Sequence, residues 1–486
     1  MRLVRSMRIR MRSRGVEGQK MTLGPLETDT IAAIATATGR GALGIVRLSG
    51  AAAIPIGDSM FRGKHSLREA PDKTVLVGEI VRRDGVALDQ VLMVAMRGPH
   101  TATGEDVVEI TCHGGLLVPR LVLRRLTEEG ARPAEPGEFT KRAFLNGKLD
   151  LAQAEAVEQI VRAASEQALQ VAMRQLKGEL SRSMGNLERG LLAWLVLIEA
   201  NIDFAEDEID PVDRTAVARD LELTAKRIED LITAHDQGKY LRDGLDVAIV
   251  GKPNAGKSSL FNRLVGHDRV IVSETPGTTR DVVDGLAGVD GLVLRLHDTA
   301  GMRRPSDGLE AEAIRRTRET VADADIALVV LDASTGLGAG DREVLQEVAT
   351  KPRVVVANKV DLPAADTPRA FWGEVELILQ GSEPGVRVSA LTGDGLPELR
   401  ERLGGLARDL VGGMDQELIV NERHARALRE ALAATRRAAG AAGTGIPLEF
   451  VASDIRLALD RLGDVTGKAA SSRVLDEVFS KFCIGK

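Results

Sequence analysis

The segment 251–258 reads Gly-Lys-Pro-Asn-Ala-Gly-Lys-Ser and fits the phosphate-binding pattern G-x-x-x-x-G-K-[S/T]. It stands between a strand-like run, 245–250, and a helix-like run, 259–264, which is the context that such a loop requires. There the backbone N–H groups surround the phosphates at the positive end of the helix, Lys257 reaches the β- and γ-phosphate oxygens, and Ser258 ligates Mg²⁺. The segment predicts a nucleoside triphosphate site, and a chance glycine turn is the alternative.

A second motif supports this interpretation. Asp298-Thr-Ala-Gly follows the apolar run 292–296. Asp298 is therefore expected at the end of a strand, close to Mg²⁺, and Gly301 is expected to offer its N–H group to the γ-phosphate.

Two later motifs identify the base. Asn358-Lys-Val-Asp follows the run 354–356, and Ser389-Ala matches the loop whose backbone lies behind guanine O6. The Asp361 carboxylate can accept hydrogen bonds from N1–H and the 2-amino group of guanine, which adenine lacks, so ATP would leave a buried charge unpaired. The four motifs together predict a GTP-binding domain. The residues predicted to bind GTP are Asn254, Ala255, Gly256, Lys257, Ser258, Ser259, Ser273, Glu274, Thr275, Pro276, Gly277, Thr278, Thr279, Asp298, Thr299, Ala300, Gly301, Asn358, Lys359, Asp361, Ser389 and Ala390.

The machinery for hydrolysis differs from that of Ras-type proteins. Met302 follows Gly301, where those proteins carry the glutamine that orients the attacking water. A thioether cannot orient water, so another group must do so. Glu310 and Glu312 lie at a plausible distance along the chain, with surface carboxylates on a helix as the alternative interpretation.

A cation site is also indicated beside the phosphates. Asn254 places a side-chain carbonyl oxygen in the loop, and the segment 273–281 contains Thr279, the most plausible switch residue and Mg²⁺ ligand. Oxygen ligands from Asn254 and the neighbouring backbone suit a hard cation. Such a cation would stabilise the charge that develops during hydrolysis, where other systems insert an arginine.

Composition limits the function classes. The chain has 486 residues, enough for two to four domains, and a net charge of −6; residues 1–20 carry +6, which leaves −12 for the remainder. An acidic body with 2% aromatic residues argues against a broad nucleic-acid-binding face. Two cysteines and no membrane-length apolar run lead us to expect a soluble protein of the bacterial cytoplasm. A mitochondrial presequence is the alternative interpretation of the basic start.

The pattern of apolar residues predicts a multidomain protein of α/β and α+β class. Short β-rich runs, among them 45–48 and 75–81, dominate up to about residue 142. Helical spacing dominates after residue 151 and again in the run 422–438, and strands alternate with helices between them. We expect a P-loop GTPase domain with a doubly wound, mostly parallel sheet, inserted in an α-helical domain. The predicted parts are a disordered basic extension (1–20), a β-rich domain (21–142), a first helical part (143–238), the G domain (239–408) and a second helical part (409–486).

From residue 21 to residue 486 the chain resembles the MnmE (or TrmE) family of tRNA-modification GTPases. The resemblance is carried by Gly41–Gly50, Thr103-Gly-Glu-Asp, His113-Gly-Gly, Pro136-Gly-Glu-Phe, Phe144-Leu-Asn-Gly-Lys-Leu-Asp, Thr278-Thr-Arg-Asp and the terminal Phe482-Cys-Ile-Gly-Lys. Ala37-Thr38 departs from the prolines that are usual in the family.

The resemblance implies an N-terminal folate-binding domain that also dimerises, and a heterotetrameric complex with the FAD-dependent protein MnmG. Together they would install an aminomethyl-type group at C5 of the wobble uridine of certain tRNAs. Arg47, Glu109, Lys148 and Lys486 would contact 5-formyltetrahydrofolate or a related folate, the donor of the one-carbon unit.

The resemblance also assigns the groups that act in hydrolysis. Glu310 would orient the water and act with Lys257 and Asn254, while Ser258 and Thr279 would bind Mg²⁺. The K⁺ ligands would be Asn254, Ser273, Thr275 and Thr278, in two G domains that meet face to face.

Two alternatives belong to other classes. An Era- or Der-like ribosome-assembly GTPase shares the Pro-Gly-Thr-Thr-Arg-Asp switch, but it predicts a second P-loop or a C-terminal KH module with a G-x-x-G loop. A non-hydrolysing GTP-sensing scaffold is suggested by Met302 alone.

Overall fold

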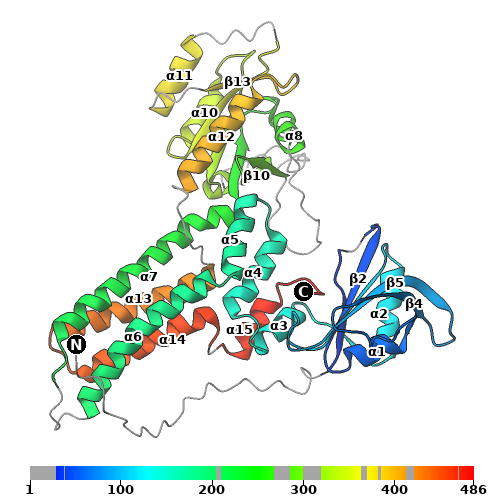
Figure 1. The fold of residues 1–486 in the computed structure, drawn as a ribbon. Helices are drawn as coiled ribbons and strands as arrows, with labels where there is room; N and C mark the ends of the chain where they lie inside the picture. The colour runs from blue at the N-terminus through cyan, green and yellow to red at the C-terminus, as the bar shows by residue number, and fades with distance from the viewer. Residues whose placement is uncertain are drawn as a thin grey trace, which may run out of the picture. The chain divides into compact units, whose positions relative to one another are not determined.

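The computed structural model describes residues 29–37, 39–203, 210–267, 285–298, 319–362, 369–380, 385–411, 421–468 and 470–486. The predicted extension 1–20 lies outside them. The chain forms two compact units (Figure 1): unit 1 joins Met1–Glu155 to Ala470–Lys486, and unit 2 is Ala156–Ala469. Within the described ranges, no helix combines the length and the apolar character that crossing a membrane requires.

Unit 1 is built on a mixed β-sheet. Its described strands are β1 (Ile31–Ile34), β2 (Leu43–Ser49), β3 (Phe61–Gly63), β4 (Val75–Val81), β5 (Ala87–Met96), β6 (Val107–His113) and β7 (Arg132–Pro133). They lie in the order β3-β4-β5-β6-β2-β1-β7. Neighbouring strands are antiparallel except for β1 and β7, which are parallel.

One face of this sheet is covered by α1 (Ala53–Ser59) and α2 (Val118–Glu128). Burial alternates along β2 and β6, as expected for strands that pack one face on a core. The core between sheet and helices includes Val46, Leu48, Met93, Ile110, Val122 and Leu126.

The opposite face is open over β4 and β5. Val77 and Leu92 are paired across these strands, and they are 61% and 44% exposed. Val75, on the same face, is 56% exposed. Apolar side chains gathered in this way on a sheet face are a feature of interaction surfaces.

The C-terminal segment completes unit 1. Helix α15 (Ser472–Phe479) packs against α3 (Glu138–Leu145), and the Phe139 N–H group at the start of α3 donates to the Lys486 oxygen at 3.2 Å. Gly137 has φ of +68°, and a Cβ atom there would lie 2.8 Å from the Phe479 carbonyl oxygen. Only glycine satisfies both conditions without strain, so Gly137 lets the two ends of unit 1 meet.

The sheet of unit 2 is mostly parallel. Its described strands are β8 (Leu245–Val250), β9 (Gly285–Val289), β10 (Leu292–Asp298), β11 (Ile326–Asp332), β12 (Arg353–Asn358) and β13 (Val386–Val388), in the order β13-β12-β11-β8-β10-β9. Only β9 pairs antiparallel among these strands. Strands β8 and β11 are almost continuously apolar and buried, as is typical of strands covered on both faces.

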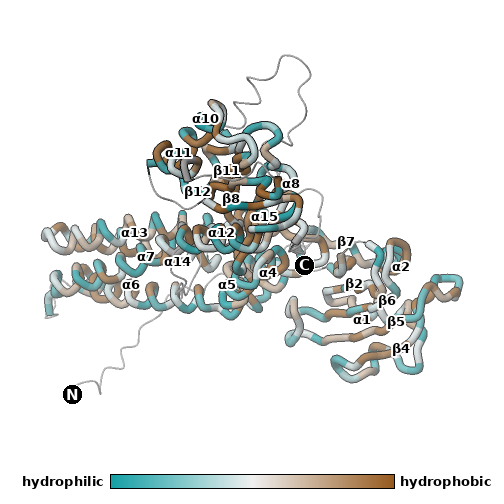
Figure 2. Tube along the Cα trace, turned by 90° about the horizontal axis from the view of Figure 1, so that it is seen from above, coloured by the Kyte–Doolittle hydropathy of each residue, from teal (hydrophilic) through white to brown (hydrophobic). Residues whose placement is uncertain are grey.

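Helices cover both faces of this sheet. On one face lie α8 (Lys257–His267) and α12 (Leu396–Val411), and on the other lie α10 (Ala339–Glu347) and α11 (Arg369–Leu379). In Figure 2 the apolar colour gathers on the central strands β8, β11 and β12. This is the predicted doubly wound arrangement.

The remainder of unit 2 is helical. It contains α4 (Leu151–Arg162), which begins in unit 1, α5 (Glu166–Leu176), α6 (Glu179–Asp203), α7 (Arg214–Asp243), α13 (Glu422–Gly443) and α14 (Leu448–Thr466). Helix α13 packs against α7 and α14, and α14 packs against α6 (Figure 1). The buried face of α13 consists largely of alanine, which allows a close approach of neighbouring helices.

The G domain enters after α7 and returns to α13, and these two helices pack together. The predicted fold class is therefore confirmed: a P-loop domain inserted in a helical domain, preceded by a β-rich domain.

Candidate functional site

The phosphate-binding loop follows β8 and leads into α8. Strand β10 lies parallel to β8, with Asp298 beside Ile249, and this register brings Asp298 to the loop. Ser258 Oγ donates to Asp298 Oδ2 at 2.7 Å. The predicted Mg²⁺ ligand Ser258 and the predicted strand-end carboxylate are thus in direct contact.

Lys257 is 6% exposed, and its Nζ donates to the carbonyl oxygens of Gly251 and Lys252 at 2.7 Å each. Burial lowers the pKa of Lys257, and the charge of Asp298 offsets only part of this effect. The loop therefore holds its own lysine by backbone carbonyls.

Asn254 lies in the same loop with φ of +65°, a left-handed conformation that asparagine tolerates better than most residues. It is exposed, and it has no hydrogen-bond partner among the described residues. The side-chain oxygen of Asn254 is accordingly accessible to a cation.

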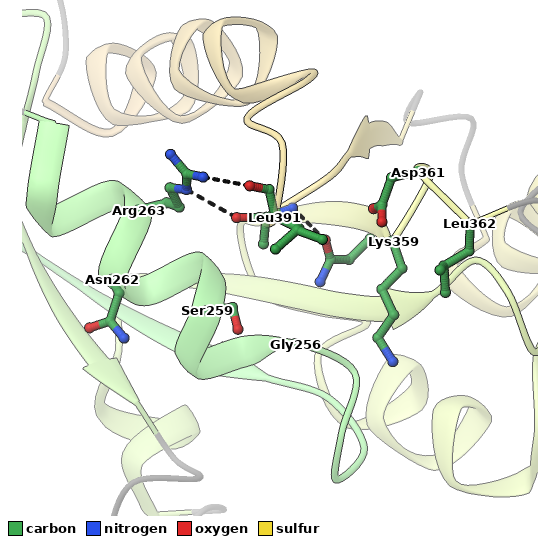
Figure 3. Close-up of a pocket in the computed structure, with 10 residues that line it drawn as sticks. Gly256, Ser259, Asn262, Arg263, Lys359, Asp361, Leu362 and Leu391 are labelled. Atoms are coloured by element: carbon green, nitrogen blue, oxygen red, sulfur yellow. Dashed lines mark hydrogen bonds between the residues drawn. The ribbon is translucent and has the colours of Figure 1, made fainter.

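A cavity of about 520 Å³ adjoins the loop (Figure 3). Asn358, which is 1% exposed, connects two segments that line the cavity. Its Nδ2 donates to the Ala255 carbonyl oxygen at 2.8 Å, and its Oδ1 accepts from the Ala390 N–H group at 3.0 Å. The cavity is lined by Gly256, Ser259, Asn262, Arg263, Asn358, Lys359, Asp361, Leu362, Ala390 and Leu391.

The predicted base-reading residues meet at this cavity. Asp361 Oδ1 accepts from Ser389 Oγ at 2.6 Å, which fixes the carboxylate at the cavity wall. Lys359 Nζ contacts Asp332 Oδ2 at 2.6 Å. Burial raises the pKa of Asp332, but its hydrogen bonds from Lys359 and Ser334 outweigh burial and lower the pKa overall. Three motifs that are distant in sequence therefore form one site at the carboxyl ends of the strands, where ligands bind in open α/β sheets.

Other predicted residues lie outside the described residues. These are Ser273, Glu274, Thr275, Pro276, Gly277, Thr278, Thr279, Thr299, Ala300, Gly301, Met302, Glu310 and Glu312. Of the predicted cation ligands, only Ser258 and Asn254 are placed.

Unit 1 contains three residues predicted to contact folate, Arg47, Glu109 and Lys486, which together with Phe139 form a group that we name the Arg47 cluster. Strands β2 and β6 pair Arg47 with Glu109, and Glu109 Oε1 accepts from Arg47 Nη2 at 2.7 Å. The guanidinium carbon of Arg47 lies 5.8 Å from the centre of the Phe139 ring, within cation–π range. Because the Phe139 N–H group binds the Lys486 oxygen, the cluster joins β2, β6, α3 and the C-terminal segment.

Lys148, the fourth residue predicted to contact folate, has other contacts than the residues of the Arg47 cluster. Lys148 Nζ donates to the Pro99 carbonyl oxygen at 3.0 Å. Its neighbour Asn146 binds the Thr103 carbonyl oxygen at 2.8 Å, and Thr103 Oγ1 lies 2.7 Å from Ser49 Oγ, two residues after Arg47. Among the described residues, no hydrogen bond or ion pair joins Lys148 directly to the Arg47 cluster, and the two are connected through Asn146, Thr103 and Ser49.

The sequence analysis missed a buried charge network beneath α3. Arg142 is 1% exposed and contacts Asp29 Oδ1 at 2.7 Å, Glu138 Oε1 at 3.0 Å and Glu105 Oε2 at 3.2 Å. Arg132 also contacts Asp29 and Glu138. The only signal in the sequence was the spacing of Glu138 and Arg142, which pairs residues one helical turn apart.

A second cavity, of about 330 Å³, lies in unit 1 between the end of β1 and the start of α2. Thr36, Arg40, Gly115 and Arg120 are among its lining residues. None of the four residues predicted to bind folate lines it.

The fold and the nucleotide site define a P-loop GTPase whose G domain interrupts a helical domain. Comparison with known proteins extends this definition to the whole chain. Residues 30–148 match the family described as "GTP-binding protein TrmE N-terminus", and residues 151–483 match the family described as "MnmE helical domain".

Curated relatives match over nearly the full length. The tRNA modification GTPase MnmE of Salinibacter ruber is 43% identical, over 95% of this chain and 100% of the relative. That of Moorella thermoacetica is 44% identical, over 94% and 99%. A crystal structure of Era with MgGDPNP and a segment of 16S ribosomal RNA is 29% identical over 39% of this chain and 66% of that chain, with a TM-score of 0.28.

The chain belongs to the MnmE family of tRNA modification GTPases. It is a GTP-hydrolysing enzyme that acts in tRNA modification, with GTP and tRNA as its substrates. This membership decides against both the Era- or Der-like alternative and the non-hydrolysing scaffold.

Proposed function

We propose that this GTPase, with an FAD-dependent partner of the MnmG type, adds an aminomethyl-type group at C5 of the wobble uridine of certain tRNAs. The carbon comes from a formyl- or methylene-tetrahydrofolate bound in unit 1. The observation that carries this proposal is the Arg47 cluster, in which residues from β2, β6, α3 and the C-terminal segment meet.

The residues of the Arg47 cluster fit the chemistry of a folate. The 2-amino-4-oxopteridine edge presents adjacent N–H donors, which a carboxylate such as Glu109 accepts as Asp361 would accept those of guanine. The glutamyl carboxylates of the folate suit an arginine or lysine. The side chains of Arg47 and Glu109 are 27% and 31% exposed, so both are accessible to a ligand.

Folate binding can be tested on the full-length protein by titration with 5-formyltetrahydrofolate. Glu109→Gln removes the charge and turns one acceptor into a donor, so we expect affinity to fall by about tenfold or more. Deletion of the last few residues removes Lys486 and should abolish folate-dependent tRNA modification.

Both variants should bind GDP as the parent does, because the nucleotide site lies in unit 2. The surface variant Arg342→Ala, which breaks an exposed ion pair with Glu374, is the matched control. Parental folate affinity in Glu109→Gln, or normal modification by the truncated protein, would refute the assignment.

For hydrolysis we propose that K⁺ completes the site. Asn254, with Ser273, Thr275 and Thr278, would hold K⁺; Ser258 and Thr279 would hold Mg²⁺; Glu310 would orient the water. The accessible oxygen of Asn254 supports this assignment, because K⁺ takes oxygen ligands and its charge would stabilise the transition state. Lys257 would neutralise the β- and γ-phosphates.

We further propose that the protein is a homodimer, which with two MnmG-type partners gives a heterotetramer. The exposed apolar residues Val75, Val77 and Leu92 support a contact between two copies of unit 1. Two G domains would then meet face to face, and the bound K⁺ would order the switch across them.

These two proposals predict that GTPase activity rises with K⁺ and with protein concentration. The measurement is the initial rate of phosphate release in matched K⁺ and Na⁺ buffers of equal ionic strength, across a dilution series. An increase of about tenfold or more in K⁺ is expected if the cation stabilises the transition state as fixed donors do. Equal rates in the two buffers would exclude a K⁺ role.

A further inference from the structure

Arg263 connects α8 to the loop behind the base cavity (Figure 3). Its Nε donates to the Ala390 carbonyl oxygen at 3.1 Å, and its Nη2 donates to the Leu391 carbonyl oxygen at 2.5 Å. Part of Arg263 is open to solvent, but its planar guanidinium holds two consecutive carbonyl groups. No motif in the sequence assigns a role to this residue.

The two hydrogen bonds of Arg263 fix the direction of the Leu391 N–H group, because peptide groups are planar. The Ala390 carbonyl and the Leu391 N–H group belong to one trans peptide, so they point in opposite directions. Fixing the Ala390 oxygen toward Arg263 therefore directs the Leu391 N–H group to the other side of the loop. In Figure 3 Arg263 lies on one side of Leu391, and Asp361 lies on the other.

In the described part of the loop 389–392, the N–H groups on either side of Leu391 are already hydrogen-bonded within the protein. The preceding N–H group, of Ala390, binds Asn358 Oδ1 at 3.0 Å. The following one, of Thr392, binds Ser389 Oγ at 3.0 Å. Leu391 N has no hydrogen-bond partner among the described residues, although Leu391 lines the cavity.

We propose that Arg263 is a specificity-determining positioning residue, which holds the loop so that the Leu391 N–H group donates to the 6-oxo group of the purine. Adenine carries an amino group, a hydrogen-bond donor, at position 6. Two donors, this amino group and the Leu391 N–H group, would then face each other, so adenine nucleotides would bind weakly. This inference rests on the proposed assignment of the Ser389–Ala390 loop to the guanine base.

The test compares Arg263→Ala with the parent for three diphosphates that are not hydrolysed by a GTPase. GDP and inosine diphosphate carry the 6-oxygen, and 2-aminopurine riboside diphosphate lacks it. Affinities are measured by displacement of fluorescent GDP. We expect about a tenfold loss for GDP and inosine diphosphate, which corresponds to about 1.4 kcal/mol, and less than about a twofold change for the third ligand.

A second variant and a rate measurement separate positioning from a merely structural role. Arg263→Lys keeps the charge and can donate to one of the two carbonyls, so it should recover part of the loss. In Arg263→Ala the KM for GTP should rise by the same factor as the Kd for GDP, while kcat stays within about twofold. Arg342→Ala should leave all three affinities unchanged.

Two results would overturn the proposal: unchanged affinity for GDP, or an equal loss for all three ligands. The base site itself is tested independently by Asp361→Asn, whose amide can donate to the 2-oxo group of xanthine and should shift preference toward xanthosine diphosphate. If that shift fails while Arg263→Ala still lowers affinity only for ligands that carry the 6-oxygen, the assignment of Asp361 is wrong, whereas the role of Arg263, which depends on the Ser389–Ala390 loop, stands.

Discussion

The nucleotide site of unit 2 and the Arg47 cluster of unit 1 are assembled in opposite ways. Each part of the nucleotide site comes from a short contiguous motif at the end of one strand, and the parallel sheet brings the motifs to one edge. The Arg47 cluster takes single residues from two paired strands, a helix and the end of the chain. A site of the first kind can be read from local sequence, whereas a site of the second kind depends on the whole of its unit.

The two regions also differ in the groups that bind their buried cationic side chains. In the nucleotide site, Lys257 is bound by two uncharged backbone carbonyls. In unit 1, the buried Arg142 is matched by carboxylates, and its network lies next to the Arg47 cluster through the adjacent residues Glu138 and Phe139. We therefore expect mutations in the buried Arg142 network to affect stability and mutations at Lys257 to affect binding.

The largest expected effect is the loss of stability on removing Arg142. Arg142→Met removes the 1%-exposed cation that Asp29, Glu138 and Glu105 share, although Arg132 still contacts Asp29 and Glu138. Removing one partner of a buried ion pair typically costs about 3–5 kcal/mol, and we expect the lower end of this range because Arg132 remains. Hydrogen exchange in the full-length protein should show faster exchange in residues 29–155. The peptides of the β8–β13 sheet are the internal control. If Arg142→Met changed the exchange rates of unit 1 and of this sheet equally, the expected effect on unit 1 stability would be contradicted.

A smaller effect is expected at the nucleotide site. Lys257→Ala removes the charged donor to the phosphates and should weaken GDP binding by about a hundredfold, or about 2.7 kcal/mol. Calorimetric titration with GDP measures the loss, and titration with 5-formyltetrahydrofolate on the same preparation is the control. A parallel loss of folate binding would show that the two sites are not separate.

The smallest expected effect is the response of unit 1 to acid. Burial raises the pKa of Asp29 and of Glu138, but hydrogen bonds and charge from Arg132 and Arg142 outweigh it, so both pKa values are lowered. Because the pKa values of Asp29 and Glu138 are lower in the folded state than the ordinary values of 3.8 and 4.5, their ionised carboxylates add to the free energy of unfolding above those ordinary values. This added stability is lost as the pH falls below 4.5 and 3.8 and through the folded-state pKa values. Scanning calorimetry between about pH 6 and 3.5 should show a fall of a few degrees in the melting temperature of unit 1.

Glu138→Gln removes one of these titrations, so its melting temperature should depend less on pH over the same range. A slope as steep as that of the parent protein would show that other groups carry the acid response.

The elements themselves were largely predictable. The β-rich run 75–81 coincides with β4, and the helical run 422–438 lies within α13. The run 45–48 underestimates β2, which extends over Leu43–Ser49 because its pairing with β6 continues from His113 to Val107. That extension depends on the partner strand, so no local pattern contains it.

Asn358, Asp361 and Ala390, which were predicted from separate motifs, line one cavity, and their binding of GTP stays a prediction. Arg263 and Arg142 were not predicted, because their partners lie far away in sequence: Ala390 for Arg263, and Asp29 for Arg142. Arginines on amphipathic helices are most often solvated, and only the folded structure distinguishes those that hold another segment in place.

The union of Met1–Glu155 with Ala470–Lys486 has a consequence for biosynthesis. During translation, the residues that become α15, and Lys486, whose oxygen accepts from the Phe139 N–H group, are made after the entire G domain. Domains generally fold as units, in the order of their synthesis. Unit 1 therefore departs from that order, because the nucleotide domain can fold before the β-rich unit, which was made earlier, gains α15.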